Sequence, residues 1–383
     1  MTEPNSPNTE PAQARPVRGV IDVRDKDAYI RVHGYAPSDD DIKLSGDQLR
    51  RHGLRRGDVV SGLATPNPKR RGSSALTTLA TVNGAAARDQ ARRPAFADLV
   101  PLFPNERLRL ETAADEPIGR VVDLVAPIGK GQRGLIVARP NTGKTTVMKT
   151  LARAVAANHP ECHLMMVLID ERPEEVTELR RAVDAEIIAS TFDHTPKRHT
   201  GVAELAVERA KRLVESGQDV VMLLDSITRL ARAYNLAAPG GGRVLTGGLD
   251  AGALYPPKKF LGAARNIDGA GSLTILATAL VDTGSRLDEV IFEEFKGTGN
   301  MELRLDRTLA DRRVFPAIDI TASGTRREDL LFTPEELRST TVLRRALSSL
   351  DTQAAMEQLL ARLRTTSSNA AFLGQASTTR AAA

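Results

Sequence analysis

Residues 135–146 read Leu-Ile-Val-Ala-Arg-Pro-Asn-Thr-Gly-Lys-Thr-Thr, and this stretch decides the fold of most of the chain. A short apolar run comes first, and a helical pattern follows to about Ala157. Residues 138–145 fit the spacing of a phosphate-binding P-loop, with Ala138 in place of the first Gly. A strand, a tight loop and a helix in this order point backbone N–H groups and a helix dipole at a phosphate. The sequence therefore predicts a P-loop nucleotide-binding domain.

Two further apolar runs end in carboxylates. Residues 220–224 are followed by Asp225, and residues 164–169 are followed by Asp170, Glu171 and Arg172. Open α/β sheets bind their ligands at the carboxyl ends of the strands, so these side chains are expected beside the P-loop. We interpret Glu171 as the general base for the attacking water and Arg172 as a phosphate contact.

The cofactors implied by this arrangement are ATP and Mg²⁺. Lys144 can reach the β- and γ-phosphates, while the Thr145 hydroxyl and the Asp225 carboxylate are the expected metal ligands.

Composition indicates in which cellular compartment the protein is expected. The chain has 383 residues, of which 41% are hydrophobic and 26% charged, as in ordinary globular proteins. One cysteine, Cys162, excludes a disulfide framework. The first residues lack a secretory signal pattern, and no apolar run approaches the roughly 18 residues that cross a membrane. We therefore expect a cytoplasmic protein without a membrane partner.

Positive charge is concentrated near the amino terminus. Between Lys43 and Arg93, eleven Lys or Arg residues face three Asp residues, a local charge of +8. Such a block favours a polyanion as partner, because neutralising phosphates releases counterions. Nucleic acid is the favoured interpretation, and a solvated basic surface is the alternative.

Composition and hydrophobic pattern divide the chain into four parts. Residues 1–17 are expected to form a disordered tail. Residues 18–85 contain short β-rich runs between Gly, Pro and Asp turns, which indicates a small all-β barrel. Residues 86–125 resemble a linker, and residues 126–383 alternate buried strands with amphipathic helices, ending in helices.

Several long strings closely resemble the Rho family of transcription terminators, in the order that the family has them. They include LIDERPEEVTELRR at 168–181, LLDSITRLARAYN at 223–235, EEFKGTGNMEL at 293–303, RVFPAID at 313–319 and SGTR at 323–326. The resemblance covers about residues 127–331 and also reaches the barrel. It implies an α/β fold, in which a RecA-like P-loop ATPase domain follows an OB-like (cold-shock-like) barrel. It also implies a short form without the helical subdomain that usually precedes the barrel.

The resemblance implies an RNA-dependent ATPase and 5′ to 3′ translocase. The expected partners are single-stranded RNA, the RNA polymerase elongation complex and further copies of the chain in a homo-hexameric ring. Two alternatives remain: a Rho paralogue that serves as a regulatory or RNA-binding ring component, and a rotary ATP synthase-type subunit.

Site residues follow from the same resemblance. The catalytic residues are Lys144, Glu171 and two arginine fingers that reach a neighbouring subunit, Arg313 and Arg326. The ATP-binding residues are Gly129, Lys130, Gly131, Gln132, Arg133, Gly134, Asn141, Thr142, Gly143, Lys144, Thr145, Thr146, Arg172, Asp225 and the adenine-stacking Phe315. The RNA contacts are Tyr29, Arg31 and Lys43 in the barrel, Val244, Leu245 and Thr246 in a first pore loop (239–248), and Arg286 in a second (282–286).

Some positions depart from the family pattern. Where the family shows Gly-Phe-Gly-Phe this chain has Lys-Asp-Ala-Tyr at 26–29, and Lys43 replaces an aromatic residue. Each lost base-stacking platform is worth about 1–3 kcal/mol. In the P-loop, Asn141 removes a positive charge and Arg139 adds one, which we expect a few ångströms from the phosphates. These changes are expected to alter rate and affinity while ATPase activity is kept.

Overall fold

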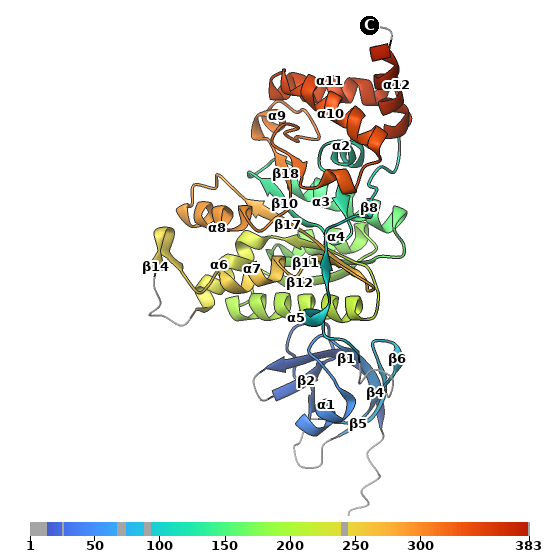
Figure 1. Cartoon of the computed structure of the whole chain (residues 1–383). Helices are drawn as coiled ribbons and strands as arrows, with labels where there is room; N and C mark the ends of the chain where they lie inside the picture. Colours follow the sequence, from blue (N-terminus) through green and yellow to red (C-terminus); the bar gives the residue numbers. More distant parts are fainter. Residues whose placement is uncertain (1–13, 25–26, 67–73, 88–92, 239–243, 382–383) are drawn as a thin grey trace, which may run out of the picture. The chain divides into compact units, whose positions relative to one another are not determined.

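The structure is a computed structural model that describes residues 14–24, 27–66, 74–87, 93–238 and 244–381 (Figure 1). The chain divides into two compact units. The first is Met1–Ala95 together with Leu205–Arg212, and the second is Phe96–Glu204 with Leu213–Ala383. Among the described residues, no helix is long and apolar enough to span a membrane.

The amino-terminal unit is a small β-barrel. Its strands are β1 (Arg15–Arg24), β2 (Asp27–Arg31), β3 (Ile42–Leu44), β4 (Val59–Pro66), β5 (Ser74–Val82) and β6 (Ala85–Ala86), in the order β3-β2-β1-β4-β5-β6. A parallel pairing of Lys43 with Ala75 joins β3 to β5 and closes the barrel. Alternate residues such as Ile21, Ile30 and Val60 fill its core. This agrees with the predicted OB-like barrel.

The structured part of the barrel begins earlier than the sequence suggests. Strand β1 starts at Arg15, inside the expected tail, because Arg15 and Val17 pair with Ala64 and Gly62 of β4. Helix α1 (Gly46–His52) follows β3 and begins at Ser45, whose side chain forms a capping box with Gln48.

The second unit is built on a nine-stranded sheet. Its main path is β12 (Glu186–Thr191), β11 (His163–Glu171), β13 (Val220–Asp225), β17 (Ser272–Leu280), β10 (Arg133–Ala138), β18 (Met301–Leu305) and β19 (Gly324–Thr325), with β16 (Arg265–Ile267) and β7 (Pro101–Leu102) beside it. The strands from β12 to β18 are parallel. The small pairs are β8 (Arg107–Leu108) with β9 (Ile128–Gly129), and β14 (Val244–Leu245) with β15 (Leu249–Asp250).

Helices cover both faces of this sheet, with α2 and α3 on one side and α5 and α6 on the other (Figure 1). The helices that connect or flank the strands are α2 (Pro117–Val125), α3 (Lys144–Asn158), α4 (Pro173–Ala182), α5 (Pro196–Glu215), α6 (Ile227–Ala237), α7 (Tyr255–Leu261), α8 (Arg286–Lys296) and α9 (Arg307–Asp311). Alternate strand residues, among them Ile136, Met166 and Val221, pack in one core with α2 and α3. The strand and helix order is the one that the P-loop string predicts.

Three helices close the chain: α10 (Pro334–Ser348), α11 (Thr352–Arg364) and α12 (Asn369–Ala381). Their apolar residues, including Leu343 and Leu359, join the core of α2. The fully buried Arg120 of α2 donates to the Leu363 and Thr366 carbonyls over 2.8 and 2.9 Å, which fixes the end of α11. Short 3-10 turns lie at η2 (Phe96–Asp98), η3 (Thr246–Gly248) and η4 (Glu328–Leu330).

Candidate nucleotide and RNA site

The P-loop connects β10 to α3. Gly143, the N-cap of α3, has a left-handed backbone with φ 85°, and Asn141 also has a positive φ of 63°. The Thr142 hydroxyl donates to the Arg139 carbonyl over 2.8 Å and holds the turn. No side chain caps α3, so its first N–H groups are available to a phosphate. Thr145 and Thr146 lie in the first turn of this helix.

Three side chains that the sequence predicts at the site lie together. Lys144 Nζ is 2.6 Å from Asp225 Oδ2 and 3.3 Å from Glu171 Oε1. Asp225 ends β13, and its other oxygen accepts a hydrogen bond from the Thr278 hydroxyl of β17 at 2.7 Å. A lysine and two carboxylates at the carboxyl edge of a parallel sheet can bind phosphate and a divalent cation.

Glu171 has an unusual environment. Its side chain is almost fully buried, and this burial and the nearby Asp225 raise its pKa, while Lys144 and Arg229 act in the opposite direction. The guanidinium of Arg229 lies 2.9 Å from Glu171 Oε1. A carboxylate with a raised pKa is suited to accept a proton from water.

Sequence reasoning missed Arg229. It stands in the first turn of α6, where its backbone N–H donates to the Ser226 hydroxyl that caps the helix. Its position in the sequence could have indicated its role. Arg229 lies four residues after Asp225, and the first helical turn after a strand that ends at the site lies close to that site.

Phe315 lies beside the P-loop. A Cβ atom added to Gly143 would be 3.8 Å from the Phe315 ring, which is 47% exposed. This geometry leaves a ring face available for an adenine. Arg313, two residues earlier, is exposed and has a positive φ of 61°. Arg172 is also exposed, with a single 4.0 Å contact to Glu175.

Arg326 lies at the opposite end of the sheet. Its N–H donates to the Asn300 carbonyl over 2.8 Å, directly before β18. In the register of β18 with β10, Met301 is opposite Gly134 and Leu305 is opposite Ala138, where the P-loop begins. Five strand residues separate these ends by roughly 15 Å. Arg326 is therefore too far away to reach the P-loop of its own chain.

The predicted ATP-binding residues at 129–134 share this distant end, so they do not line the P-loop of the same chain. Lys130 is buried, and its Nζ is 2.6 Å from Glu106 and 2.8 Å from Asp219. The Gln132 side chain donates to Asn300 over 2.7 Å. Arg133 and Gly134 begin β10, and the rest of this strand separates the segment from the P-loop. Gly129, Gly131, Arg133 and Gly134 are held in the same segment.

Three arginines gather near this end. Burial lowers the pKa of Arg133, and the positive charges of Arg265 and Arg326 lower it further. A shallow cavity of about 300 Å³, lined by Asn300 and Arg326 among others, lies beside them. Clustered guanidinium groups attract anions, and here the anionic group could belong to another molecule.

The two expected pore loops contact each other. Residues 239–243 of the first loop lie outside the described residues, whereas Val244 and Leu245 form β14 and Thr246 begins η3. A Cβ atom on Gly247 would be 3.0 Å from the Leu287 nitrogen and 3.1 Å from the Arg286 carbonyl. Arg286 is exposed at the start of α8. Segments forty residues apart in sequence thus form one surface.

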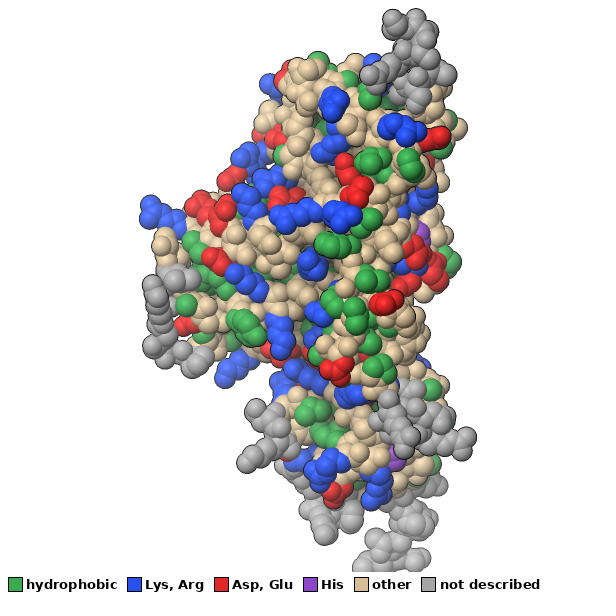
Figure 2. All heavy atoms as spheres, in the orientation of Figure 1, with side chains coloured by type: hydrophobic (Ala, Val, Ile, Leu, Met, Phe, Trp, Pro, Cys, Tyr) green, Lys and Arg blue, Asp and Glu red, His purple; other side chains and the backbone are tan. Residues whose placement is uncertain are grey.

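In the barrel, the side chains expected to contact RNA differ in how accessible they are. Tyr29 is opposite Lys43 in the β2–β3 pairing, and Lys43 Nζ lies 5.9 Å from the Tyr29 ring centre. Arg31 is only 5% exposed and pairs with Asp22 at 2.6 Å and with Asp41. Two carboxylates of the barrel already pair with its guanidinium, so RNA binding by Arg31 stays a prediction that requires an exchange of these partners. Figure 2 shows other Lys and Arg side chains exposed on the barrel.

No group of three His, Cys, Asp or Glu side chains that could hold a metal ion occurs in the described part of the chain. The predicted metal ligands, Thr145 and Asp225, belong instead to a site that a nucleotide would complete, since Mg²⁺ commonly binds through one or two protein groups and phosphates.

Comparisons with known proteins match both units. The profile of the Rho termination factor RNA-binding domain matches residues 17–88, and that of the ATP synthase alpha/beta family nucleotide-binding domain matches residues 119–325. Transcription termination factor Rho of Streptomyces lividans is 60% identical over 364 residues, which cover 94% of this chain and 51% of that protein. The Mycobacterium tuberculosis protein of the same name is 56% identical over 95% of this chain and 62% of its own length.

The match extends over nearly the full length of another relative. Transcription termination factor Rho of Streptosporangium roseum is 59% identical over 372 residues, which cover 97% of this chain and 95% of that protein. By contrast, the chain spans between about half and two thirds of the length of the two relatives above.

Solved structures share the fold at low sequence identity. An ATPase of a bacterial type III secretion system aligns with a TM-score of 0.59 and 21% identity over 73% of this chain and 86% of that chain. An ATP synthase subunit of Nanoarchaeum equitans aligns with a TM-score of 0.56 and 17% identity over 65% of this chain and 62% of its own. These likenesses support the RecA-like fold of the second unit.

Proposed function

Because this chain belongs to the family of transcription termination factor Rho, we propose that it is an RNA-dependent ATPase that moves 5′ to 3′ along single-stranded RNA and terminates transcription. One observation carries the proposal: strand β17 serves both sites. Its Thr278 bonds Asp225 in the nucleotide site, and the strand ends at Leu280, just before the loop that leads to Arg286. A structural change that nucleotide binding causes at Asp225 can thus reach the RNA contact Arg286 along a short stretch of the chain.

The nucleotide site works through its own side chains. Lys144, now paired with Asp225, turns to the β- and γ-phosphates when ATP enters. Thr145 and Asp225 would hold Mg²⁺, which would neutralise charge on the phosphates when bound. Glu171 accepts a proton from the attacking water, and Phe315 stacks on the adenine.

A second subunit completes each site. Arg326 and the basic residues near it lie at the end of the sheet away from the P-loop, which supports the proposal that they reach the site of a neighbouring copy. This head-to-tail use of two different surfaces generates a ring when the rotation closes. We propose a homo-hexamer with Arg326 as the arginine finger, and with Arg313 and the 129–134 segment at the same interface.

RNA contacts are proposed in the barrel and, separately, in the pore loops. In the barrel, Tyr29 offers a base-stacking face and Lys43 a phosphate contact. Thr246, Val244, Leu245 and Arg286 then hold the strand in the ring. The RNA polymerase elongation complex in the cytoplasm is the proposed target.

One alternative is kept because of a specific observation. Arg31 is bound to barrel carboxylates, and Lys43 stands where the family has an aromatic residue, so primary RNA capture is weaker. This favours, as a second candidate, a regulatory ring component that depends on a complete partner. A rotary ATP synthase-type subunit is not retained, because the Rho RNA-binding profile matches the barrel and a Rho protein matches over 95% of its length.

The test is ATP hydrolysis measured against poly-cytidine RNA. We expect slow hydrolysis alone, stimulation by RNA, loss of both in Lys144→Ala, and release of transcripts from stalled elongation complexes. A flat response over a wide RNA titration, with ATP still bound, favours the regulatory component.

A further inference from the structure

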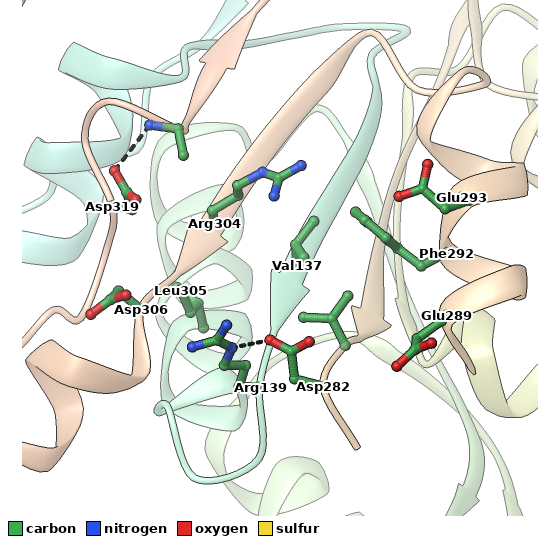
Figure 3. Close-up of a pocket in the computed structure, with 12 residues that line it drawn as sticks. Val137, Arg139, Asp282, Glu289, Phe292, Glu293, Arg304, Leu305, Asp306 and Asp319 are labelled. Carbon is green, nitrogen blue, oxygen red and sulfur yellow. Dashed lines mark hydrogen bonds and ion pairs between the residues drawn. The ribbon is translucent and has the colours of Figure 1, made fainter. Parts of the chain in front are cut away.

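Two loops leave the sheet side by side. Strands β10 and β17 are parallel neighbours with Ala138 opposite Leu280, and the Val281 N–H donates to the Ala138 carbonyl over 3.1 Å. Ala138 is followed by Arg139, the second residue of the P-loop, and Val281 is followed by Asp282, the first residue of the second pore loop. Their side chains form an ion pair (Figure 3). Arg139 therefore contacts the RNA loop, not the phosphate position where the sequence placed it.

The surroundings of this pair are acidic. It borders a cavity of about 330 Å³ whose walls include the carboxylates of Asp282, Glu289, Glu293, Asp306 and Asp319. The other arginine in the wall, Arg304, is held 2.8 Å from Glu302 and lies over the Phe292 ring (Figure 3). Arg139 is thus the cation that neutralises Asp282. Without it, a negative charge would stand at the base of a loop that must attract RNA phosphates.

The far end of the same loop is anchored separately. At this end the buried Asp288, in the first turn of α8, receives the guanidinium of Arg232 on α6 at 2.7 Å. Asp288 also accepts a hydrogen bond from the hydroxyl of Thr283, near the start of the loop. Asp282 itself has a left-handed backbone with φ 51°, a conformation that L residues adopt only when their contacts favour it. The loop is therefore fixed on α6 at one end and on the P-loop at the other.

We propose that the Arg139–Asp282 ion pair couples the P-loop to the second pore loop, so that nucleotide and RNA each strengthen the binding of the other. Arg139 is a positioning residue: bound phosphates order the P-loop, the ordered Arg139 holds Asp282, and the loop presents Arg286 to RNA. The coupling is reciprocal, because linked equilibria affect each other equally. The proposal rests on the proposed function, which assigns residues 282–286 to RNA.

A double-mutant cycle tests the coupling. The affinity for a labelled oligocytidine RNA is measured with and without a non-hydrolysable ATP analogue at saturation. In Arg139→Ala and in Asp282→Ala, we expect the enhancement by the analogue to fall about two- to five-fold, the range of a solvent-exposed pair. The double variant should lose no more than either single variant, and the swap Arg139→Asp with Asp282→Arg should restore most of the enhancement.

A matched control removes another ion pair near the P-loop. Lys149 of α3 binds Glu178 of α4 at 2.6 Å, away from the RNA loops, so Lys149→Ala should keep the full enhancement. Single variants that keep the enhancement, or losses that multiply in the double variant, would overturn the proposal.

Hydrogen exchange separates this proposal from the proposed function, because it needs no RNA. The ATP analogue should slow amide exchange at residues 281–286 in the unaltered chain and have less effect in Arg139→Ala, at concentrations where both bind the analogue. If the analogue leaves these amides unprotected in the unaltered chain, the coupling is refuted. If it protects them but no RNA binds, the proposed function fails and with it the effect on RNA, while the coupling of the P-loop to residues 282–286 stands.

Discussion

Among single residues, Glu171 has the environment that a general base requires. Burial and the charge of Asp225 raise its pKa, and the cations of Lys144 and Arg229 restrain that rise. A carboxyl group with a raised pKa loses its charge at a higher pH than an ordinary one. The pH dependence of hydrolysis therefore reports directly on this side chain.

We expect ATP hydrolysis to fall on acidification through an apparent pKa above 4.5, the ordinary value for Glu, because protonated Glu171 cannot accept a proton. Arg229→Ala removes a cation that favours the carboxylate, so this acid limb should move to higher pH. Glu171→Gln should lower kcat by about 10²–10⁴ and remove the limb. The measurement is kcat against pH at saturating ATP and RNA. An acid limb that moves to lower pH in Arg229→Ala would contradict the assignment.

How far the sequence predicts a residue's place depends on where its partners lie. Glu171 and Asp225 could be located because each ends a strand whose apolar run marks it in the sequence, a purely local signal. Lys130 and Arg31 could not, because their carboxylate partners come from other elements. The sequence motif identifies Lys130 as a candidate site residue. Only the strand pairing in the folded protein shows at which end of β10 it lies.

At the scale of elements, the contact between the two pore loops offers a matched pair of substitutions. Gly247 and Gly248 have nearly equal positive φ angles, 79° and 80°. A Cβ atom on Gly247 would press on the backbone of Arg286 and Leu287, whereas one on Gly248 would meet nothing within 4 Å. An alanine at either position therefore has the same backbone cost of a positive φ. Only the alanine at Gly247 would also clash with the backbone of α8.

We expect Gly247→Ala to weaken the response to RNA more than Gly248→Ala. Both pay about 1–2 kcal/mol for a left-handed alanine, but only the first separates η3 from α8. The measurement is the RNA concentration that gives half-maximal ATPase stimulation, with thermal unfolding to confirm that both variants fold. Equal shifts in the two variants would mean that the packing of the loops does not affect RNA binding.

The elements themselves are largely predictable, because local patterns specify them. Alternation of apolar residues gives the barrel strands, and the strand–P-loop–helix order gives the parallel sheet. The start of β1 at Arg15 is less predictable, since its Pro- and Arg-rich residues become a strand only by pairing with β4. The expected linker at 86–125 likewise contains α2, whose buried face belongs to the ATPase core.

For the whole molecule, the main consequence concerns assembly. Within one chain, the P-loop lies at one end of β10 and Arg326 at the other, so Arg326 can serve the proposed catalytic site only in a neighbouring copy. On the proposed function, we expect activity only when copies associate head to tail. The family relationship supplies the proposed role of Arg326, and the geometry of the single chain is consistent with that role being played in a neighbouring copy.

Mixed rings test this arrangement. Lys144→Ala and Arg326→Ala should each abolish most hydrolysis, the second by about 10³-fold or more. When the two variants are co-expressed, about a quarter of randomly formed interfaces combine an intact Lys144 with an intact Arg326 from the neighbour. Single-turnover hydrolysis should therefore reappear in the mixture at a corresponding fraction of the unaltered burst. A finger acting within its own chain would leave every subunit deficient, and the mixture would stay as inactive as its components.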